Sequence, residues 1–429
     1  MMSMPTLVRQ QLTRHQGRIE LIVRYVMGQG ILQVVNVLNG FLLLRWLNID
    51  EQAKFSVAMA LMATLGLLGD LGFGGSLMGL IGTRTGDKVA VGQYIRGIQY
   101  FKNRFLLVSI IIGSGLAFVY YQRHGWRYDL AAIFGLLLVS VYAQSESGYY
   151  AALLQINRNL ADFYRPQIAS AAVRLLVSTV LFAWAGLSAL LVVLLTTLVF
   201  VANTWWMKRR ASIYYVPAQQ TSPTIRRQIW KTLLPVAPMV LYYALQGQLT
   251  IFLAGLYGQS QNLADIGALS RLAQLFALLT PFTTVVLMPY LARSDAKQLP
   301  HRYLLVCLAG LGVSFPLFVV AYLNPTPFLW LLGDKFDALR PEIGLYILTA
   351  SLWYMTGIVW AANMARRWNY WYTSLLYVGL TLTVQLTCIS HFDLSETHSL
   401  VMLGFYMACS TLVAYLLTSI TGYLNQARQ

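Results

Sequence analysis

Long apolar segments follow one another along nearly the whole chain, separated by short polar stretches rich in arginine and lysine. A helix that crosses a membrane needs roughly 20 mainly apolar residues, and the sequence contains twelve segments of this kind. The predicted spans are residues 20–44, 54–82, 102–121, 130–156, 164–184, 187–207, 232–256, 264–291, 303–323, 342–364, 369–390 and 398–423. The pattern therefore predicts an all-α, multi-pass membrane protein with twelve transmembrane helices.

Basic residues are distributed unevenly among the loops that join these spans. With the N-terminus in the cytoplasm, 22 of the 31 lysines and arginines fall on the cytoplasmic side. The opposite side receives six, namely Arg45, Lys54, Arg123, Arg127, Lys335 and Arg340. Cytoplasmic loops of membrane proteins carry such an excess, and one miscounted span would remove it. We therefore expect both termini in the cytoplasm.

The composition excludes most soluble functions. The chain is 57% hydrophobic and 11% charged over 429 residues, which is far from the usage of a soluble domain. A net charge of +16 would suggest nucleic-acid binding in a soluble protein. In a membrane protein, basic loops and anionic lipid headgroups explain it. Membrane lipids, and not nucleic acid, are the expected partners.

Motifs of catalysis and of metal binding are absent from the sequence. No glycine-rich phosphate loop is present, so we do not expect the chain to hydrolyse ATP. The five histidines are scattered, and the three cysteines lie inside apolar spans, so neither a zinc site nor a disulfide framework is indicated. We therefore expect no enzyme activity, no catalytic residues, no metal and no cofactor.

A basic connection between residues 208 and 231 separates six spans from six spans. Similar segments lead into the second and the eighth span, RWLNIDEQAKFSVAMALMATLGLLGD and GLYGQSQNLADIGALSRLAQLFALLTP. An offset of six spans gives both halves the same orientation, as in parallel repeats. We therefore predict two parallel six-helix lobes, residues 1–211 and 212–429, around a central cavity.

The fifth predicted span carries one charge near its middle, Arg174. At about 100° per residue, Gln167, Ser170 and Ser178 share its helix face. A charge at mid-membrane costs roughly 2.5–3.5 kcal/mol on insertion scales and usually faces a bundle interior or a wet cavity. Glu146 of the preceding span lies at similar depth in an antiparallel hairpin. The two residues form either a buried ion pair or an anion site in which the glutamate tunes the arginine.

The first two spans hold further candidate residues. Gln33 and Asn36 lie on one polar stripe of the first span and are candidate substrate ligands. Arg24 lies off this stripe near the cytoplasmic end, where it either extends to the interface or contacts the substrate. Asp70 lies within the second span without a local cation. It makes a structural polar contact or, like Glu146, couples transport to an ion.

The second half begins with a span that the sequence predicts to bend. Pro235 and Pro238 interrupt its backbone hydrogen bonding, and Gly247 adds conformational freedom. Gln246 directly precedes this glycine and Gln248 directly follows it, and both are candidate cavity residues.

Two later spans add polar and aromatic candidates. Arg271 and Gln274 share one face of the eighth span, where the arginine either faces a cavity or anchors a lipid headgroup. In the tenth span, Trp353, Tyr354 and Trp360 fit an interfacial aromatic belt better than a site for sugar stacking.

Three stretches resemble a known family. The segment RWLNIDEQAKFSVAMALMATLGLLGDLGFGGSL is similar to the end of the first helix and the second helix of polysaccharide biosynthesis flippases, including O-antigen flippases. These flippases belong to the multidrug/oligosaccharidyl-lipid/polysaccharide exporter superfamily. IGALSRLAQLFALLTPFTTVVLMPYLAR resembles the eighth helix of that family, and LLGDKFDALRPEIGLYIL resembles the loop entering its tenth helix. The matching residues are Arg45, Trp46, Leu47, Phe55, Asp70, Leu71, Gly72, Arg271, Gln274, Pro289 and Leu291, whereas Asn48 replaces a glycine usual in the family.

The resemblance implies a flippase in a bacterial inner membrane. Such a protein moves a polyprenyl-pyrophosphate-linked oligosaccharide from the cytoplasmic to the periplasmic leaflet by alternating access, beside polysaccharide polymerase and chain-length components. The residues agree, because three arginines within spans (Arg24, Arg174 and Arg271) outnumber two central acids, and arginine binds phosphate groups in bidentate fashion.

Two other functions stay open. An ion-coupled antiporter for small molecules or drugs, from the same superfamily, would need a net-acidic cavity for cationic substrates. A scaffold for glycan-assembly enzymes, without transport activity, would have little use for polar helix faces within the membrane.

Overall fold

The computed structural model describes residues 4–70, 80–81, 86–157, 159–233, 237–279, 283, 291, 298–366, 368 and 370–427. These residues are almost entirely helical, as the spacing of apolar segments predicts. The first half contains α1 (Met4–Trp46), α2 (Ile49–Asp70), α4 (Lys88–His124), α5 (Arg127–Ile156), α6 (Leu160–Ala185) and α7 (Ala189–Ala211). The second half contains η1 (Ser212–Tyr214), α8 (Pro223–Leu233), α9 (Ala237–Gln246), α10 (Leu249–Tyr257), α11 (Ser260–Ala277), α14 (Leu299–Leu323), α15 (Thr326–Leu332), η3 (Asp334–Leu339), α16 (Arg340–Arg366), α17 (Trp371–His391) and α18 (Thr397–Ala427).

Ten helices of the described chain are long and apolar enough to cross a membrane. They correspond to ten of the twelve predicted spans, so the all-α, multi-pass fold is confirmed. The predicted seventh span is divided at Gly247 and Gln248, which form a turn between α9 and α10. The bend predicted for this span is therefore found at the glycine, while Pro235 lies outside the described residues. The predicted eighth span begins in α11, and its later part, with Pro289, also lies outside them.

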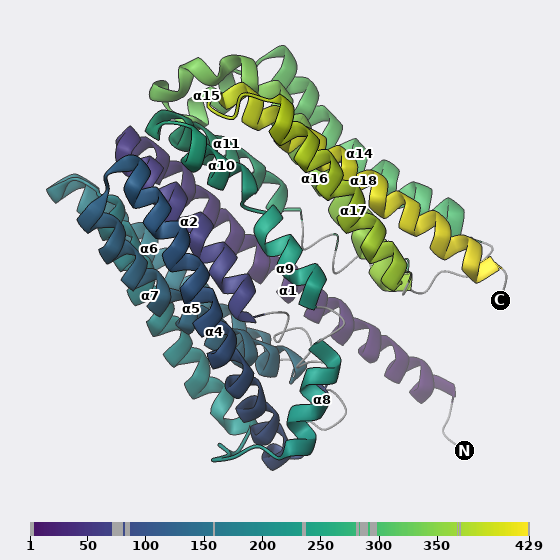
Figure 1. Ribbon diagram of the computed structural model, residues 1–429. Coiled ribbons are helices and arrows are strands. Elements are labelled where there is room, and N and C mark those ends of the chain that lie inside the picture. Colours follow the sequence, from purple (N-terminus) through teal and green to yellow (C-terminus); the bar gives the residue numbers. More distant parts are fainter. Residues whose placement is uncertain are drawn as a thin grey trace.

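The helices form two groups that meet at one end (Figure 1). Helices α4, α5, α6 and α7 lie on one side, and α14, α16, α17 and α18 lie on the other. Helices α1, α2, α9, α10 and α11 lie between these groups. The groups converge at the end that holds α15, here called the α15 end, and diverge toward the end that holds the two chain termini, here called the terminal end.

Backbone carbonyls and small residues join the two halves at the α15 end. Arg45 donates a hydrogen bond to the carbonyl of Trp330 and lies 4.7 Å from the centre of its ring. Lys335 donates to the carbonyl of Leu47. Gly267 of α11 lies so close to α2 that an added Cβ would be 1.9 Å from the Ser56 hydroxyl oxygen. The turn between α1 and α2 is thereby attached to α15, η3 and α11.

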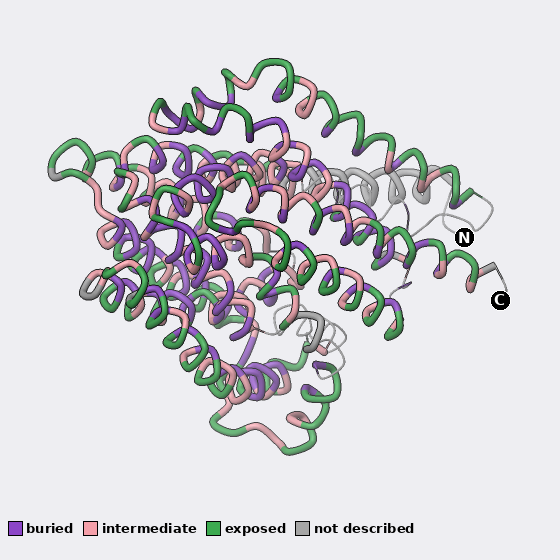
Figure 2. Tube along the Cα trace, turned by 45° about the horizontal axis from the view of Figure 1, so that its top comes forward, coloured by how far each residue is buried: buried purple, intermediate pink, exposed green. Residues whose placement is uncertain are grey.

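The largest group of buried apolar residues draws on both halves, with members from α1, α2, α10, α11, α15, α16 and α18. Figure 2 shows buried residues concentrated where the helices converge and exposed residues along the outer helices.

Asn48 caps the start of α2, because its side chain accepts a 2.8 Å hydrogen bond from the Glu51 amide. Glycine has no side-chain oxygen and could not accept this capping hydrogen bond.

Helix α8, in the connection between the halves, packs against α4 of the first half. Ile229 and Leu233 are its buried residues, and an added Cβ at Gly97 of α4 would lie 2.6 Å from Ile229. Trp230 stacks on Phe101 with ring centres 5.7 Å apart. The connection is therefore held on the first half beyond residue 211, the predicted boundary.

Candidate functional site

Five of the predicted substrate-binding residues line one cavity of about 400 Å³, here called the arginine cavity. Helix α1 provides Gln33 and Asn36, α6 provides Arg174, and α11 provides Arg271 and Gln274. The two arginines come from different halves of the chain. Helices α2 and α7 complete the walls. The structure therefore brings together residues that the sequence places in three separate spans.

Arg174 faces α1. One of its terminal nitrogens, Nη2, donates a 2.5 Å hydrogen bond to Oδ1 of Asn36. Its Nε is buried and has no hydrogen-bond partner among the described residues. Gln167 and Ser170 line the cavity beside it, as the shared helix face predicts, whereas Ser178 is buried away from the cavity lining. Part of the guanidinium is therefore held in place, and part is left without an acceptor.

Arg271 lies across the cavity on α11. Its guanidinium carbon is 5.3 Å from the centre of the Phe55 ring, and its Nε is buried without a partner among the described residues. Gly40 of α1 makes room for it, because a Cβ there would lie 3.4 Å from Arg271 Cδ and 3.2 Å from Gln274 Oε1. The absence of a side chain at residue 40 thus lets α11 present both polar groups to the cavity.

The charges of the arginine cavity are of one sign. Arg174 and Arg271 repel each other, and no aspartate or glutamate is among the described residues of the lining. Burying a charge without a counter-charge is costly. An anion between the two guanidinium groups would offset that cost and provide the missing acceptors, so the arrangement is suited to binding a group of negative charge.

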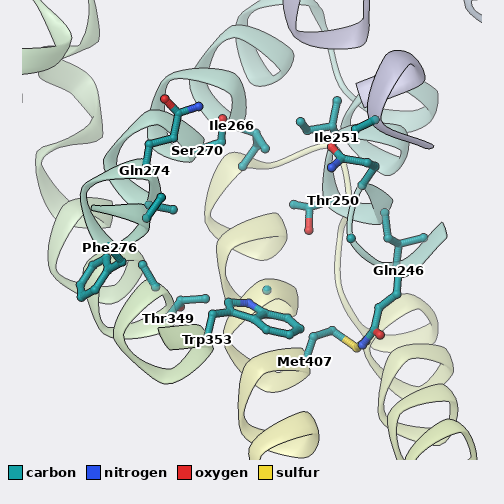
Figure 3. A pocket seen from close by; sticks show the side chains of 18 of the residues that line it. Gln246, Thr250, Ile251, Ile266, Ser270, Gln274, Phe276, Thr349, Trp353 and Met407 are labelled. Carbon is teal, nitrogen blue, oxygen red and sulfur yellow. The ribbon is translucent and has the colours of Figure 1, made fainter. Parts of the chain in front are cut away.

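A second cavity, here called the aromatic cavity, has a volume of about 790 Å³ and lies between α2 and helices α9, α10, α11, α16 and α18. Figure 3 shows Trp353 extending into it, with Gln246 and Thr250 on one side of the view and Ser270 and Gln274 on the other. Gln246, predicted as a cavity residue, lies in the wall. It accepts a hydrogen bond from the Tyr377 hydroxyl and donates one to Thr411 over 3.5 Å.

The aromatic residues of the tenth predicted span, now in α16, line this cavity. Trp353, Tyr354 and Trp360 are all part of the lining, whereas the sequence favoured an interfacial belt for them. Hydropathy alone does not distinguish the two, because both place an aromatic side chain in a helix within the membrane.

The two predicted coupling acids lie away from both cavities. Neither Asp70 nor Glu146 is in the described lining of either one. The described ion pairs include none between Arg174 and Glu146. Arg174 points to α1, while Glu146 on α5 lies near Lys102 of α4. Of the two alternatives for these residues, the direct ion pair is therefore not what the structure contains.

Lys102 is a buried cation that the hydropathy pattern did not indicate. Its side chain is only 2% exposed, and its amine donates to the Tyr142 carbonyl over 3.0 Å and to the Tyr149 hydroxyl over 3.3 Å. Tyr149 in turn donates to Glu146 over 3.5 Å, and the charge of Asp70 also acts on Lys102. Lys102 is the first residue of the third predicted span and was therefore expected at its cytoplasmic end, whereas α4 begins fourteen residues earlier, at Lys88.

Arg24 is a further predicted substrate-binding residue. Arg24 belongs to α1, but its side chain lies outside the described part of the structure. Within the described residues, no group of three or more His, Cys, Asp or Glu side chains could hold a metal ion.

Solved structures with a similar fold come from transporters. A multidrug resistance MATE family transporter of the MOP superfamily, in an inward-facing conformation, aligns with a TM-score of 0.66 and 15% identity over 92% of this chain and 95% of its own. Lipid II flippase MurJ, in an inward closed conformation, aligns with a TM-score of 0.62 and 9% identity over 94% and 91%. A MOP superfamily transporter from Pyrococcus furiosus, described as having a binding pocket of reversed polarity, aligns with a TM-score of 0.60 and 14% identity over 94% and 95%.

These likenesses show that the chain has the fold of MOP superfamily transporters. This fold agrees with the resemblance of the three sequence stretches, and the assignment to O-antigen flippases stays a prediction. Comparison of the sequence with protein-family models and with curated proteins gives no match.

Proposed function

We propose that this protein is a flippase that carries a polyprenyl-pyrophosphate-linked oligosaccharide across a bacterial inner membrane by alternating access. The observation that carries the proposal is the arginine cavity, which Arg174 and Arg271 both line without an acid among the described lining residues. A pyrophosphate presents several anionic oxygens, and planar guanidinium groups match phosphate oxygens in bidentate fashion.

The fold supports movement of such a lipid. Lipid II flippase MurJ, whose substrate by its name is a lipid, shares the fold. The chain also has two groups of helices that diverge toward the terminal end (Figure 1). The excess of basic residues in the loops on this side supports a cytoplasmic location for this end. In this proposal the conformation described here opens toward the cytoplasm, where the lipid-linked oligosaccharide is taken up.

The antiporter alternative is less well supported by the same cavities. A cationic substrate requires carboxylates that no arginine neutralises, and Arg271 is the charged residue in the described lining of the aromatic cavity. Asp70 and Glu146 are in neither described lining, and their charges act on Lys102. The scaffold alternative does not explain the two cavities with polar lining residues at the junction of the halves.

Asp70 and Glu146 keep their proposed role in ion coupling, now together with Lys102, on which the charges of both acids act. Protonation of either acid would change the charge balance around a buried amine in the first half. Unchanged gradient dependence of transport in the double variant Asp70→Asn/Glu146→Gln would remove both acids from the mechanism.

The first experiment is mass spectrometry of the lipids that co-purify with the protein in mild detergent. Wild-type protein is compared with Arg174→Ala and Arg271→Ala. Loss of one charged hydrogen-bonding partner corresponds to about 10- to 100-fold weaker binding, so a retained polyprenyl-pyrophosphate glycan should disappear from both variants.

The matched control is Arg165→Ala, because Arg165 is an exposed arginine on the same helix as Arg174. This variant should retain the lipid at the wild-type level. Equal phospholipid profiles in all four proteins, with no polyprenyl-pyrophosphate in any of them, would contradict the proposal. Such a result would favour the antiporter.

A further inference from the structure

The aromatic cavity contains polar groups that the arginine site does not use. The side chains of Gln248, Thr250 and Gln274 line it and make no hydrogen bond to other described residues, and neither does the indole N–H of Trp353. These groups supply both donors and acceptors. Apart from Arg271, the described lining is uncharged. The cavity is therefore suited to a polar but neutral ligand.

The same cavity offers flat apolar surfaces. Trp353, Trp360 and Tyr243 are in its lining, and Figure 3 shows the Trp353 ring extending among the other lining residues. Methionines 59, 62 and 407 add flexible apolar contacts. A pyranose ring has an apolar face of C–H groups that stacks on an aromatic ring and a rim of hydroxyls that bond to amides. Aromatic rings beside unpaired amides match this chemistry.

The two cavities adjoin. Met59, Arg271 and Gln274 line both of them. A ligand with its anionic group between Arg174 and Arg271 therefore continues into the aromatic cavity past the side of Arg271. The volume of about 790 Å³ falls in the range of roughly 300–1,000 Å³ typical of sites for drug-sized ligands. This is enough for more than one sugar ring.

We propose that the aromatic cavity is a subsite for the neutral sugar attached to the pyrophosphate, with Trp353 as the stacking residue and Gln248 and Gln274 as hydrogen-bonding residues. This inference rests on the proposed function and adds to it a division of the ligand. The arginine cavity binds the pyrophosphate, and the aromatic cavity binds the first sugars. Specificity for the glycan then depends on α10, α11 and α16, and affinity for the anion depends on α6 and α11.

The test compares two probes with purified protein in detergent, by native mass spectrometry. One probe is bare polyprenyl pyrophosphate, and the other is polyprenyl-pyrophosphoryl-N-acetylglucosamine of the same chain length. Trp353→Leu and Gln248→Met should weaken binding of the sugar-bearing probe by roughly two- to tenfold, the size of one lost aromatic or hydrogen-bonding contact. Binding of the bare probe should stay at the wild-type level.

Three further variants make the result specific. Trp353→Phe keeps a ring for stacking and should restore most of the binding lost in Trp353→Leu. Arg174→Ala should weaken binding of both probes, because Arg174 lines the arginine cavity and not the aromatic cavity. Trp371→Ala removes a tryptophan that is 77% exposed and outside both linings, and it should change neither probe.

The outcomes separate the subsite from the flippase. If both probes bind and the two cavity variants weaken the sugar-bearing probe alone, the subsite is supported. If both probes bind but Trp353→Leu and Gln248→Met affect them equally, or not at all, the subsite is wrong while the proposed function stands. If wild-type protein retains neither probe, the proposed function fails, and the subsite fails with it.

Discussion

Replacing Gly267 with alanine is expected to open the contact between the two halves at the α15 end. Gly267 lies on α11 against Ser56 of α2. An added Cβ would be 1.9 Å from Ser56 Oγ and 2.9 Å from Ser56 Cβ. Rotation of Ser56 removes the first overlap but breaks the 2.8 Å hydrogen bond from its hydroxyl to the Gln52 carbonyl. The second overlap remains, so the helices must separate.

The magnitude follows from the cost of overpacking. Extra atoms in a well-packed interior cost about 1–3 kcal/mol. In an equilibrium between two conformations this corresponds to a shift of roughly 5- to 150-fold away from the conformation with the tight contact. Alanine also favours a helix over glycine by about 0.5–1 kcal/mol. That gain applies to α11 in both conformations and therefore cancels in their ratio.

The assay is a distance measurement by double electron–electron resonance. Spin labels are placed at Trp184 and Tyr322, which are 89% and 72% exposed and lie near the α15 end of α6 and α14. The native cysteines are replaced first, since all three are free thiols. In Gly267→Ala the distribution should move toward longer distances.

Two variants make the reasoning refutable. Adding Ser56→Gly removes both overlapping atoms and should restore the original distribution. Gly312→Ala is the control, because a Cβ at that glycine of α14 meets nothing within 4 Å. An unchanged distribution in Gly267→Ala, or a shift that Ser56→Gly does not reverse, would show that the α2–α11 contact does not determine the conformation.

Two further predictions concern polar contacts in the first half. Glu51→Gln weakens the ion pair with Lys54 (2.8 Å) and the hydrogen bond from the Ala189 amide at the start of α7. We expect the free energy of unfolding to fall by about 1–3 kcal/mol. An unchanged midpoint of thermal unfolding in detergent would contradict this expectation. Lys102→Met removes the cation beneath Tyr142 and leaves the Tyr149 hydroxyl without one of its contacts. We expect the free energy of unfolding to fall by more than about 1 kcal/mol and to recover partly when Glu146→Gln is added. A double variant no more stable than Lys102→Met would argue against an interaction between Lys102 and Glu146.

Helical periodicity was enough to predict which residues of a span share a face. Gln167, Ser170 and Arg174 lie in one cavity lining, because a regular helix fixes their relative directions. It also placed Arg271 and Gln274 together. What the pattern could not supply was the partner of each face, since the rotation of one helix against another depends on side chains from distant parts of the chain.

Glu146 and Arg174 illustrate that limit. An antiparallel hairpin gives both residues the same depth, and depth alone made an ion pair a reasonable expectation. The direction in which each side chain points is set by different neighbours. Helix α6 packs on α1 and α7, whereas α5 packs on α2, α4 and α7. Arg174 consequently meets Asn36, and Glu146 lies near Lys102.

Lys102 shows a second limit, which concerns the ends of helices. A window of apolar residues begins where the charges stop, so a lysine at its edge is assigned to the loop. In the structure α4 extends well beyond the apolar segment, and tyrosines of α5 enclose the amine. Burial of a charge in this way depends on its partners, and those partners are forty or more residues away in the chain.

Helix α11 connects the proposed anion site to the closed contact at the α15 end. It carries Gly267, which fits against α2, and Arg271 one turn later on a neighbouring part of the same face. Arg174 belongs to the other half. Any movement that separates α11 from α2 therefore changes the spacing of the two arginines. An anion bound between them, as proposed, would favour one spacing. Its binding and the closure at the α15 end would then influence each other to the same degree. We therefore expect release of the anion to accompany opening of that end.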